Sequence, residues 1–183
     1  NTSGGGTGVA NEDGLVVLNV ASTGQPVSFD PADANLVVNE YTEYDCYDTL
    51  LDFNQDGTDV VPALAESWEQ VDDLTYTYKI REGVKFSDGS DLTMDDVLYS
   101  LNRVREDAYG MSYLFEHVDS FEVDERTRTL TVHLTQPDST WKYVPATTPC
   151  QILKKSVVEA EGDAYGTNEG SIIFAIVALI QII

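Results

Sequence analysis

Residues 65–105 read AESWEQVDDLTYTYKIREGVKFSDGSDLTMDDVLYSLNRVR, and this stretch decides the fold. Residues 74–80 alternate bulky apolar or aromatic side chains with Thr and Lys, a pattern that is typical of a half-buried strand. Asp88-Gly89 indicates a turn, because glycine tolerates positive φ and aspartate hydrogen-bonds to its own backbone. We therefore expect a strand and then a tight turn in the middle of this stretch.

An amphipathic helix is predicted directly after the turn. Thr93 and Asp96 form a T-x-x-D capping box, in which each side chain binds a backbone N–H group at the start of a helix. The apolar residues of one helical stripe follow: Met94, Val97, Leu98, Leu101 and Val104. The helix is expected to cover the strand at residues 74–80.

Other parts of the chain give shorter signals. Strands are expected at four further places: residues 15–21, 121–123, 130–134 and 151–153. The second and third of these are joined by a hairpin at residues 124–127. Helical segments are expected at residues 38–51, 60–71, 137–146 and 154–162, with a short helix or loop at 109–115. One face of the first helix carries an aromatic stripe that we interpret as core: Tyr41, Tyr44, Tyr47 and Leu51.

The composition favours a folded protein and argues against nucleic acid as a partner. The chain has 183 residues, enough for one domain of ordinary size or two small ones, and 42% of them are hydrophobic. Its 32 acidic and 10 basic residues give a net charge of −22, so no basic stripe is present to neutralise phosphates. The charge indicates a strongly solvated surface, with a cation-rich habitat as the alternative explanation.

No constellation of residues points to catalysis. His117 and His133 are the only histidines, and both are interpreted as surface residues with ordinary hydrogen bonds. The adjacent pairs Asp72-Asp73 and Asp95-Asp96 point apart on a strand or helix, so neither forms a proton-sharing dyad. No G-x-S-x-G, CxxC, HExxH or P-loop motif occurs. We expect no enzyme; a secreted hydrolase would need a nucleophile and a base in one cleft.

Metal sites and cofactors are not expected either. Residues 52–57 read DFNQDG, the opening of an EF-hand calcium loop, but the twelfth position is Ala63 instead of a bidentate Glu. An Asp-Gly hairpin turn is therefore the preferred interpretation of this segment. Cys46 and Cys150 could form a disulfide in an oxidising compartment, but Cys46 lies among apolar positions of an expected helix, which favours a small buried side chain.

Residues 62–104 resemble a known family. They read PALAESWEQVDDLTYTYKIREGVKFSDGSDLTMDDVLYSLNRV and closely resemble the signature region of the family 5 extracellular solute-binding proteins, the dipeptide- and oligopeptide-binding components of ABC importers. The similarity extends from Ser28 to Thr167, which is most of the chain. It implies a mixed α/β (α+β) fold: the N-terminal part of a two-lobed clamp of the periplasmic-binding-protein type II, with the family's extra domain inserted early in the first lobe. Trp68, Phe86 and Asp88-Gly89 match this signature, and we assign them to the fold.

The resemblance also implies a domain organisation. Residues 1–14 would be a flexible leader, residues 15–50 the first segment of lobe I and residues 51–150 the inserted domain. Residues 151–183 would return to lobe I and end in an atypical apolar tail. The second lobe and the hinge return of such proteins have no counterpart here, so we expect a truncated chain that does not bind tightly by itself, since closing a clamp needs both jaws.

The same resemblance implies where a ligand would bind. Asn35, Leu36 and Val37 fall on the segment that pairs main chain to main chain with a peptide in oligopeptide-binding members, so backbone bonds would give affinity without reading side chains. Tyr109 falls near an aromatic contact of the cleft, and Thr148 falls where the chain re-enters the first lobe beside the cleft. Each of these residues could also serve as an ordinary loop or packing residue.

The function implied is capture of peptides, or of a similar small solute, and their delivery to the permease subunits of an ABC importer. Nickel, haem, a sugar or a signalling peptide remain open as ligands. The chain begins with a Gly/Ser/Thr-rich leader, and in similar proteins such a leader follows a lipidated cysteine. We therefore expect a monomer outside the cytoplasm, in the periplasm or at the cell surface, with a lipid anchor as its only membrane contact. The alternative is an acidic surface interaction module on the same scaffold without transport binding.

Overall fold

The computed structural model describes residues 9–10, 16–17, 28–31, 46–106 and 111–167. Its strands are β1 (Val9–Ala10), β2 (Val16–Val17), β3 (Leu51–Phe53), β4 (Val60–Pro62), β5 (Ala65–Asp72), β6 (Thr75–Ile80), β7 (Val118–Asp124) and β8 (Thr129–Leu134). Its helices are α2 (Met94–Glu106) and α3 (Lys155–Glu161), with the 3-10 turns η2 (Ser112–Phe115), η3 (Trp141–Ala146), η4 (Thr148–Cys150) and η5 (Gly162–Ala164). The mixed α/β class expected from the sequence is confirmed.

A four-stranded antiparallel sheet in the order β5-β6-β8-β7 is the main layer of the fold. Buried and half-buried residues alternate along β6 and along β8, as the period-2 pattern at residues 74–80 predicts. Tyr78 lies opposite Leu130 on the buried face, whereas Thr77 lies opposite Thr131 on the other face. The strands at residues 121–123 and 130–134 and the hairpin between them are confirmed as β7 and β8.

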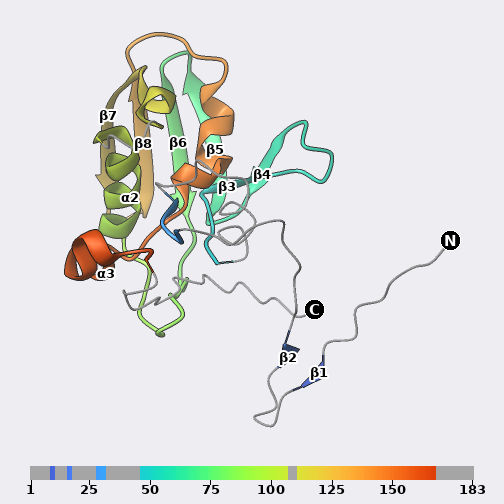
Figure 1. Ribbon diagram of the computed structural model, residues 1–183. Helices are drawn as coiled ribbons and strands as arrows, with labels where there is room; N and C mark the ends of the chain where they lie inside the picture. The colour runs from blue at the N-terminus through green and yellow to red at the C-terminus, as the bar shows by residue number, and fades with distance from the viewer. Residues whose placement is uncertain (1–8, 11–15, 18–27, 32–45, 107–110, 168–183) are drawn as a thin grey trace, which may run out of the picture.

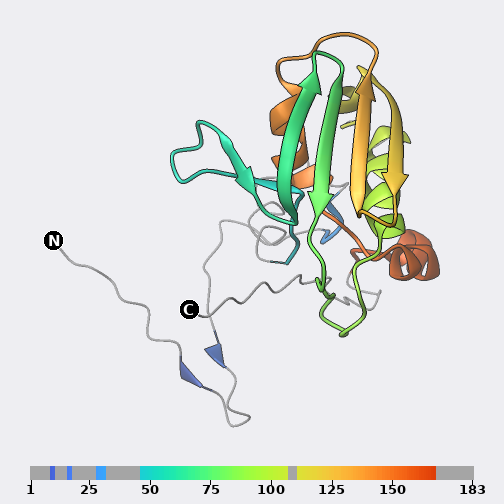
Figure 2. The ribbon, with the colours of Figure 1, turned by 180° about the vertical axis from the view of Figure 1, so that it is seen from behind.

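Helix α2 covers the buried face of this sheet (Figure 1). Its start is the expected capping box: Thr93 Oγ1 accepts the backbone N–H of Asp96 at 3.1 Å, and Asp96 Oδ2 accepts the backbone N–H of Thr93 at 3.0 Å. Of the predicted stripe, Met94, Val97, Leu101 and Val104 are buried. Seen from behind, the other face of the sheet carries none of the described helices (Figure 2). The described unit is thus a helix layer on one side of a half-exposed sheet.

Strands β3 and β4 form a separate hairpin that extends away from the sheet (Figure 1). Asn54 Oδ1 accepts the backbone N–H groups of Thr58 at 2.8 Å and Asp59 at 3.2 Å, and Gly57 has a φ of 65°, which favours glycine. The Asp-Gly hairpin turn predicted for this segment is therefore confirmed.

The helical segment predicted at residues 60–71 is wrong. These residues form β4 and β5, and β5 pairs with β6 from Ala65 to Asp72. The register of β5 shifts between Ala65 and Ser67 and again between Gln70 and Asp72. Because of these shifts, the side chains that face one side of the sheet do not recur at every second residue. These bulges remove the alternation by which a strand is recognised in a sequence.

The helix predicted at residues 38–51 is also wrong in its described part, because residues 46–50 form a turn and irregular backbone, and β3 begins at Leu51. The carbonyl of Leu50 accepts the N–H groups of Ala63 and Ala65, which are strand-type contacts to a distant segment. Residues 38–45 lie outside the described residues. Tyr47 and Leu51 are buried, which confirms their assignment to the core.

The last predicted elements are confirmed in part. The helix at residues 137–146 is reduced to the 3-10 turn η3, which contains Pro145. The strand at residues 151–153 is wrong: this segment is extended, but its N–H groups bind single acceptors, Asp48 O for Ile152 and Ser100 Oγ for Leu153, instead of a neighbouring strand. Helix α3 is confirmed and ends at Gly162, whose φ is 54°.

Three shorter predictions agree with the described residues. The short helix or loop at residues 109–115 is confirmed where it is described, as η2, and β2 lies inside the strand predicted at residues 15–21. The turn at Asp88-Gly89 is confirmed, since Gly89 has a φ of 82° and donates its N–H to Phe86 O at 2.9 Å. The apolar tail at residues 171–183 lies outside the described residues.

One hydrophobic core joins the sheet, helix α2 and the segments that flank them. It contains Tyr78 and Leu130 of the sheet and Met94 of α2, and it also contains Tyr47 and Tyr165 from the segments before and after them. Phe115 packs edge-on against Trp141, with ring centroids 5.5 Å apart. Residues 46–50 and 151–165 are therefore part of the same packed body as the sheet.

Candidate functional site

Among the ion pairs of the described residues, the one between Arg103 of α2 and Asp30 has the least exposed side chains. Arg103 Nη1 donates to Asp30 Oδ1 and Nη2 donates to Oδ2, both at 2.6 Å, so the two planar groups meet fork to fork. The side chains are 17% and 6% exposed. Helix α2 is thereby joined to a segment that lies 73 residues earlier in the sequence.

Two tyrosines continue this contact. The hydroxyl of Tyr47 donates to the carbonyl of Phe29 at 3.0 Å and lies 3.1 Å from the hydroxyl of Tyr165. The guanidinium of Arg103 lies over the Tyr165 ring, 5.9 Å from its centroid. Burial first, and then the neighbouring Tyr47, raises the pKa of Tyr165 well above its ordinary value, so this hydroxyl stays protonated.

Gly166 closes the arrangement. Phe29 donates its N–H to the Gly166 carbonyl at 2.8 Å, and Gly166 has a φ of 76°. A Cβ atom on Gly166 would lie 2.6 Å from the backbone nitrogen of Asp30, closer than any side chain can be placed. We call Phe29, Asp30, Tyr47, Arg103, Tyr165 and Gly166 the junction. It brings residues 28–31 and 165–167 together on one side of α2.

The residues predicted to bind ligand are placed only in part. Asn35, Leu36, Val37 and Tyr109 lie outside the described residues. Thr148 begins η4, is 4% exposed, and accepts the N–H of Gln151 on its carbonyl at 3.1 Å. Its role in ligand binding stays a prediction. The junction was missed by sequence reasoning, because contacts between residues so far apart leave no local pattern.

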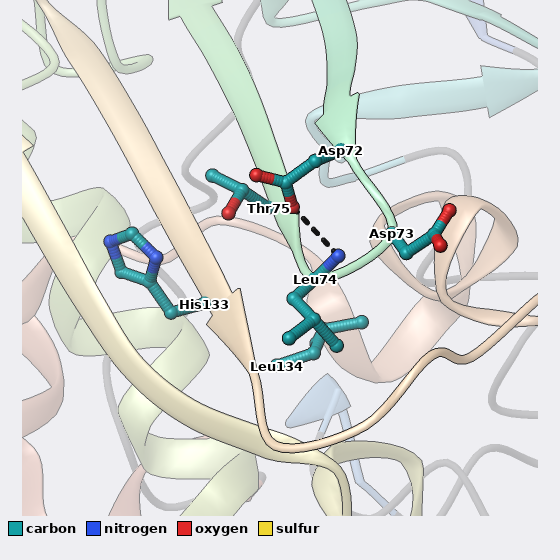
Figure 3. Close-up of a pocket in the computed structure, with 6 residues that line it drawn as sticks. All are labelled: Asp72, Asp73, Leu74, Thr75, His133 and Leu134. Atoms are coloured by element: carbon teal, nitrogen blue, oxygen red, sulfur yellow. Dashed lines mark hydrogen bonds between the residues drawn. The ribbon is translucent and has the colours of Figure 1, made fainter.

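A shallow hollow lies at the turn between β5 and β6, lined by Asp72, Asp73, Leu74, Thr75, His133 and Leu134 (Figure 3). Asp72 accepts the N–H of Leu74 at 2.8 Å, and this bond is the main reason that its pKa is lowered. Asp73 lies in the turn after β5, not on a strand, and points away from Asp72 and His133 (Figure 3). His133 Nε2 lies 3.6 Å from Glu122 Oε2 on the sheet surface. The hollow brings one histidine near two aspartates at a turn of the sheet.

Neither a metal-ligand cluster nor a disulfide is found among the described residues. Within the described part of the chain no group of three His, Cys, Asp or Glu side chains is placed to hold a metal ion. Cys150 is a buried free thiol, so it forms no disulfide with Cys46. Thr147 Oγ1 lies 3.6 Å from its sulfur, and burial raises the pKa of Cys150 to about 12. This thiol is an unreactive core residue.

Asp48 is a titratable group that no sequence motif singles out. Burial, and then the charge of Asp52, raises its pKa to about 6. It precedes β3, and its carbonyl accepts the N–H of Ile152, so it lies where residues 46–50 meet residues 151–153.

The sheet, the covering helix and the contact between residues 28–31 and 165–167 define a class of protein: part of the two-lobed clamp of periplasmic binding proteins of type II. A family model described as "Bacterial extracellular solute-binding proteins, family 5 Middle" matches residues 59–174, more than half of the chain. The chain therefore belongs to this family, and the resemblance noted from the sequence is confirmed. None of the helices among the described residues is long and apolar enough to cross a bilayer.

Similar proteins bind different solutes. The chain is 40% identical over 90 residues to "Heme-binding protein A" of Haemophilus influenzae, a match that covers 43% of this chain and 16% of that protein. It is 37% identical over 91 residues to "Di/tripeptide-binding protein 3" of Pseudomonas aeruginosa, covering 45% and 17%. The crystal structure of H. influenzae OppA in complex with the peptide RPPGFSPFR matches with a TM-score of 0.70 and 27% identity, covering 79% of this chain and 32% of that one. The chain thus spans a minor part of the length of these relatives.

Proposed function

We propose that this chain is part of an extracytoplasmic solute-binding protein that captures peptides, or a similar small solute, and delivers them to an ABC importer. The observation that carries the proposal is the family match at residues 59–174 together with the similarity to a peptide-bound clamp. We propose no catalytic activity. The permease subunits of the importer would be its protein partner, with a lipid anchor at the N-terminal side as its membrane contact and a monomeric state.

The domain organisation is proposed as residues 15–50 and 151–183 belonging to lobe I and residues 51–150 forming the inserted domain. Two observations support it. The sheet β5–β8 and helix α2 lie wholly between residues 51 and 150. The backbone contact between Phe29 and Gly166 joins the chain before that interval to the chain after it, as expected where an insertion begins and ends.

The ligand-binding residues are proposed as Asn35, Leu36, Val37, Tyr109 and Thr148. The first three would add the ligand backbone to an exposed main-chain segment, a mode that accepts many side chains. Such a mode fits a relative that is named for binding di- and tripeptides.

The experiment is calorimetric titration of the complete protein encoded by the gene with tri-alanine, RPPGFSPFR and haemin as separate probes. Binding of either peptide supports the proposal, and it should also raise the melting temperature by mass action. The backbone mode is tested by Asn35→Pro, which removes an N–H donor, against Asn35→Ala, which keeps it. The proline variant should lose affinity and the alanine variant should keep it; equal loss in both would contradict backbone recognition.

The second candidate is the acidic interaction module without transport binding. The observation that favours it is the net charge of −22, which gives a strongly anionic surface. Failure of every solute probe, together with a basic protein partner that binds in a salt-dependent way, would favour this candidate instead.

A further inference from the structure

We propose that Arg103 is a positioning residue: it fixes the segment Ser28–Pro31 against the body formed by α2 and the sheet, and so sets where the following chain begins. Asn35, the first of the proposed ligand-binding residues, is the fifth residue after Asp30. The part of this inference that concerns ligand therefore rests on the proposed function. The part that concerns the segment itself rests on the junction alone.

The ion pair has the geometry of a positioning contact. Both guanidinium nitrogens meet both carboxylate oxygens of Asp30 at 2.6 Å, which fixes the carboxylate in direction as well as in distance. A lysine at position 103 would supply charge without the fork and would leave the direction unset. The ring of Tyr165 beneath the guanidinium limits the other movements of the arginine.

The backbone next to Asp30 is held from two further sides. Phe29 donates its N–H to Gly166 O and accepts the hydroxyl of Tyr47 on its carbonyl. Asp30 in turn donates its own N–H to Ser28 Oγ at 3.0 Å. Arg103 therefore completes a set of contacts that fixes both the main chain and a side chain of one four-residue segment.

Stability alone is a weak explanation for this arrangement. A buried ion pair recovers little beyond its desolvation cost, and a well-packed apolar pair is often as stable. What an apolar pair would not reproduce is the directional fork. Orientation of Ser28–Pro31 is therefore the property that Arg103 and Asp30 supply.

Amide hydrogen exchange measured residue by residue separates these roles. Arg103→Lys should lower the protection of the Phe29 amide at least tenfold while the amides of β6 and β8 keep wild-type protection. The double variant Asp30→Leu with Arg103→Met should fold and should show the same local loss. The matched control is Arg105→Gln on the same helix, which removes contacts to Asp119 O and the Phe121 ring and should leave Phe29 unchanged. Wild-type protection of Phe29 in either Arg103 variant would overturn the proposal.

The ligand arm uses the complete protein and the peptide RPPGFSPFR as the probe. If the wild type binds it, Arg103→Lys should raise the Kd at least tenfold and Arg105→Gln should not; equal Kd values for wild type and Arg103→Lys would overturn the ligand part. If the wild type binds no probe, the proposed function fails, and the exchange measurement still decides whether Arg103 positions the segment.

Discussion

Asp96 of α2 accepts the backbone N–H of Lys155 at 3.0 Å, so one carboxylate begins two helices. Its other oxygen accepts the N–H of Thr93 in the capping box of α2. The side chain is 7% exposed, which places these bonds in a low-dielectric environment. The start of α3 is thereby tied to the start of α2.

Replacing Asp96 should destabilise the protein more than an ordinary cap substitution. Asp96→Ala leaves the backbone N–H groups of Thr93 and Lys155 without their acceptor, so we expect a loss of about 2–3 kcal/mol in the free energy of unfolding. Urea denaturation measures it. The control is Asp95→Ala, whose exposed carboxylate contacts only the flexible end of Lys155 in the described structure and should lose much less. Equal losses of stability in the two variants would show that the hydrogen bonds of Asp96 to both helix starts contribute no extra stability.

Gly166 should tolerate no side chain. Gly166→Ala imposes both an unfavourable positive φ and a contact with Asp30, whereas Gly57→Ala imposes only the first, because nothing lies within 4 Å of the new Cβ atom. We expect about 1 kcal/mol of destabilisation for Gly57→Ala and a further loss of about 1–3 kcal/mol for Gly166→Ala. Thermal or urea unfolding of both variants gives the difference, and similar values would contradict the close approach.

Because the pKa of Asp48 is raised, removing its charge should increase the stability of the folded protein by an amount that depends on pH. The pKa of Asp48 is 3.8 in the unfolded chain and about 6 in the folded protein, so the folded state favours the protonated acid. The resulting contribution to the free energy of unfolding is complete below pH 3.8 and is lost as the pH rises through 6. Asp48→Asn should therefore raise stability by about 1–2 kcal/mol at pH 7, a value reduced for partial solvent exposure. At pH 4 it should have almost no effect.

The matching measurement is urea denaturation at pH 4 and pH 7 for the wild type, Asp48→Asn and Asp56→Asn. Asp56 lies in the exposed turn between β3 and β4, so its variant should follow the wild type at both values of pH. A gain for Asp48→Asn that is the same at pH 4 and pH 7 would mean that packing, and not charge, is responsible.

Salt should stabilise this protein. A net charge of −22 on 183 residues repels itself in the compact state, and added ions screen that repulsion. We expect the melting temperature to rise by about 3 °C or more between 0.05 and 0.5 M NaCl, equivalent to about 1 kcal/mol. The rise should shrink near pH 4, where carboxylates take up protons. A melting temperature that falls with salt at pH 7 would mean that specific ion pairs outweigh the overall repulsion.

The elements with local signals were predictable, and those set by distant partners were not. Thr93 and Asp96 are three residues apart, so their capping box and the helix after it could be read directly from the sequence. The strand β5 could not, because its bulges break the alternation and its state is set by pairing with β6. The junction depends on Arg103 meeting Asp30, and no periodicity reports such a meeting. Family resemblance supplied the class of protein, while the placement of Thr148 in a buried turn came from the structure alone.

The strand order β5-β6-β8-β7 has a consequence for how the chain folds. β5 with β6 and β7 with β8 are hairpins whose strands are separated by only a few residues, so each can form with little loss of chain entropy. Pairing of Tyr76 with Val132 instead closes a long loop that contains α2. We expect both hairpins to form early and their joining along β6 and β8 to limit the folding rate. Helix α2, packed on the buried face, would then act as the template on which the two halves of the sheet meet.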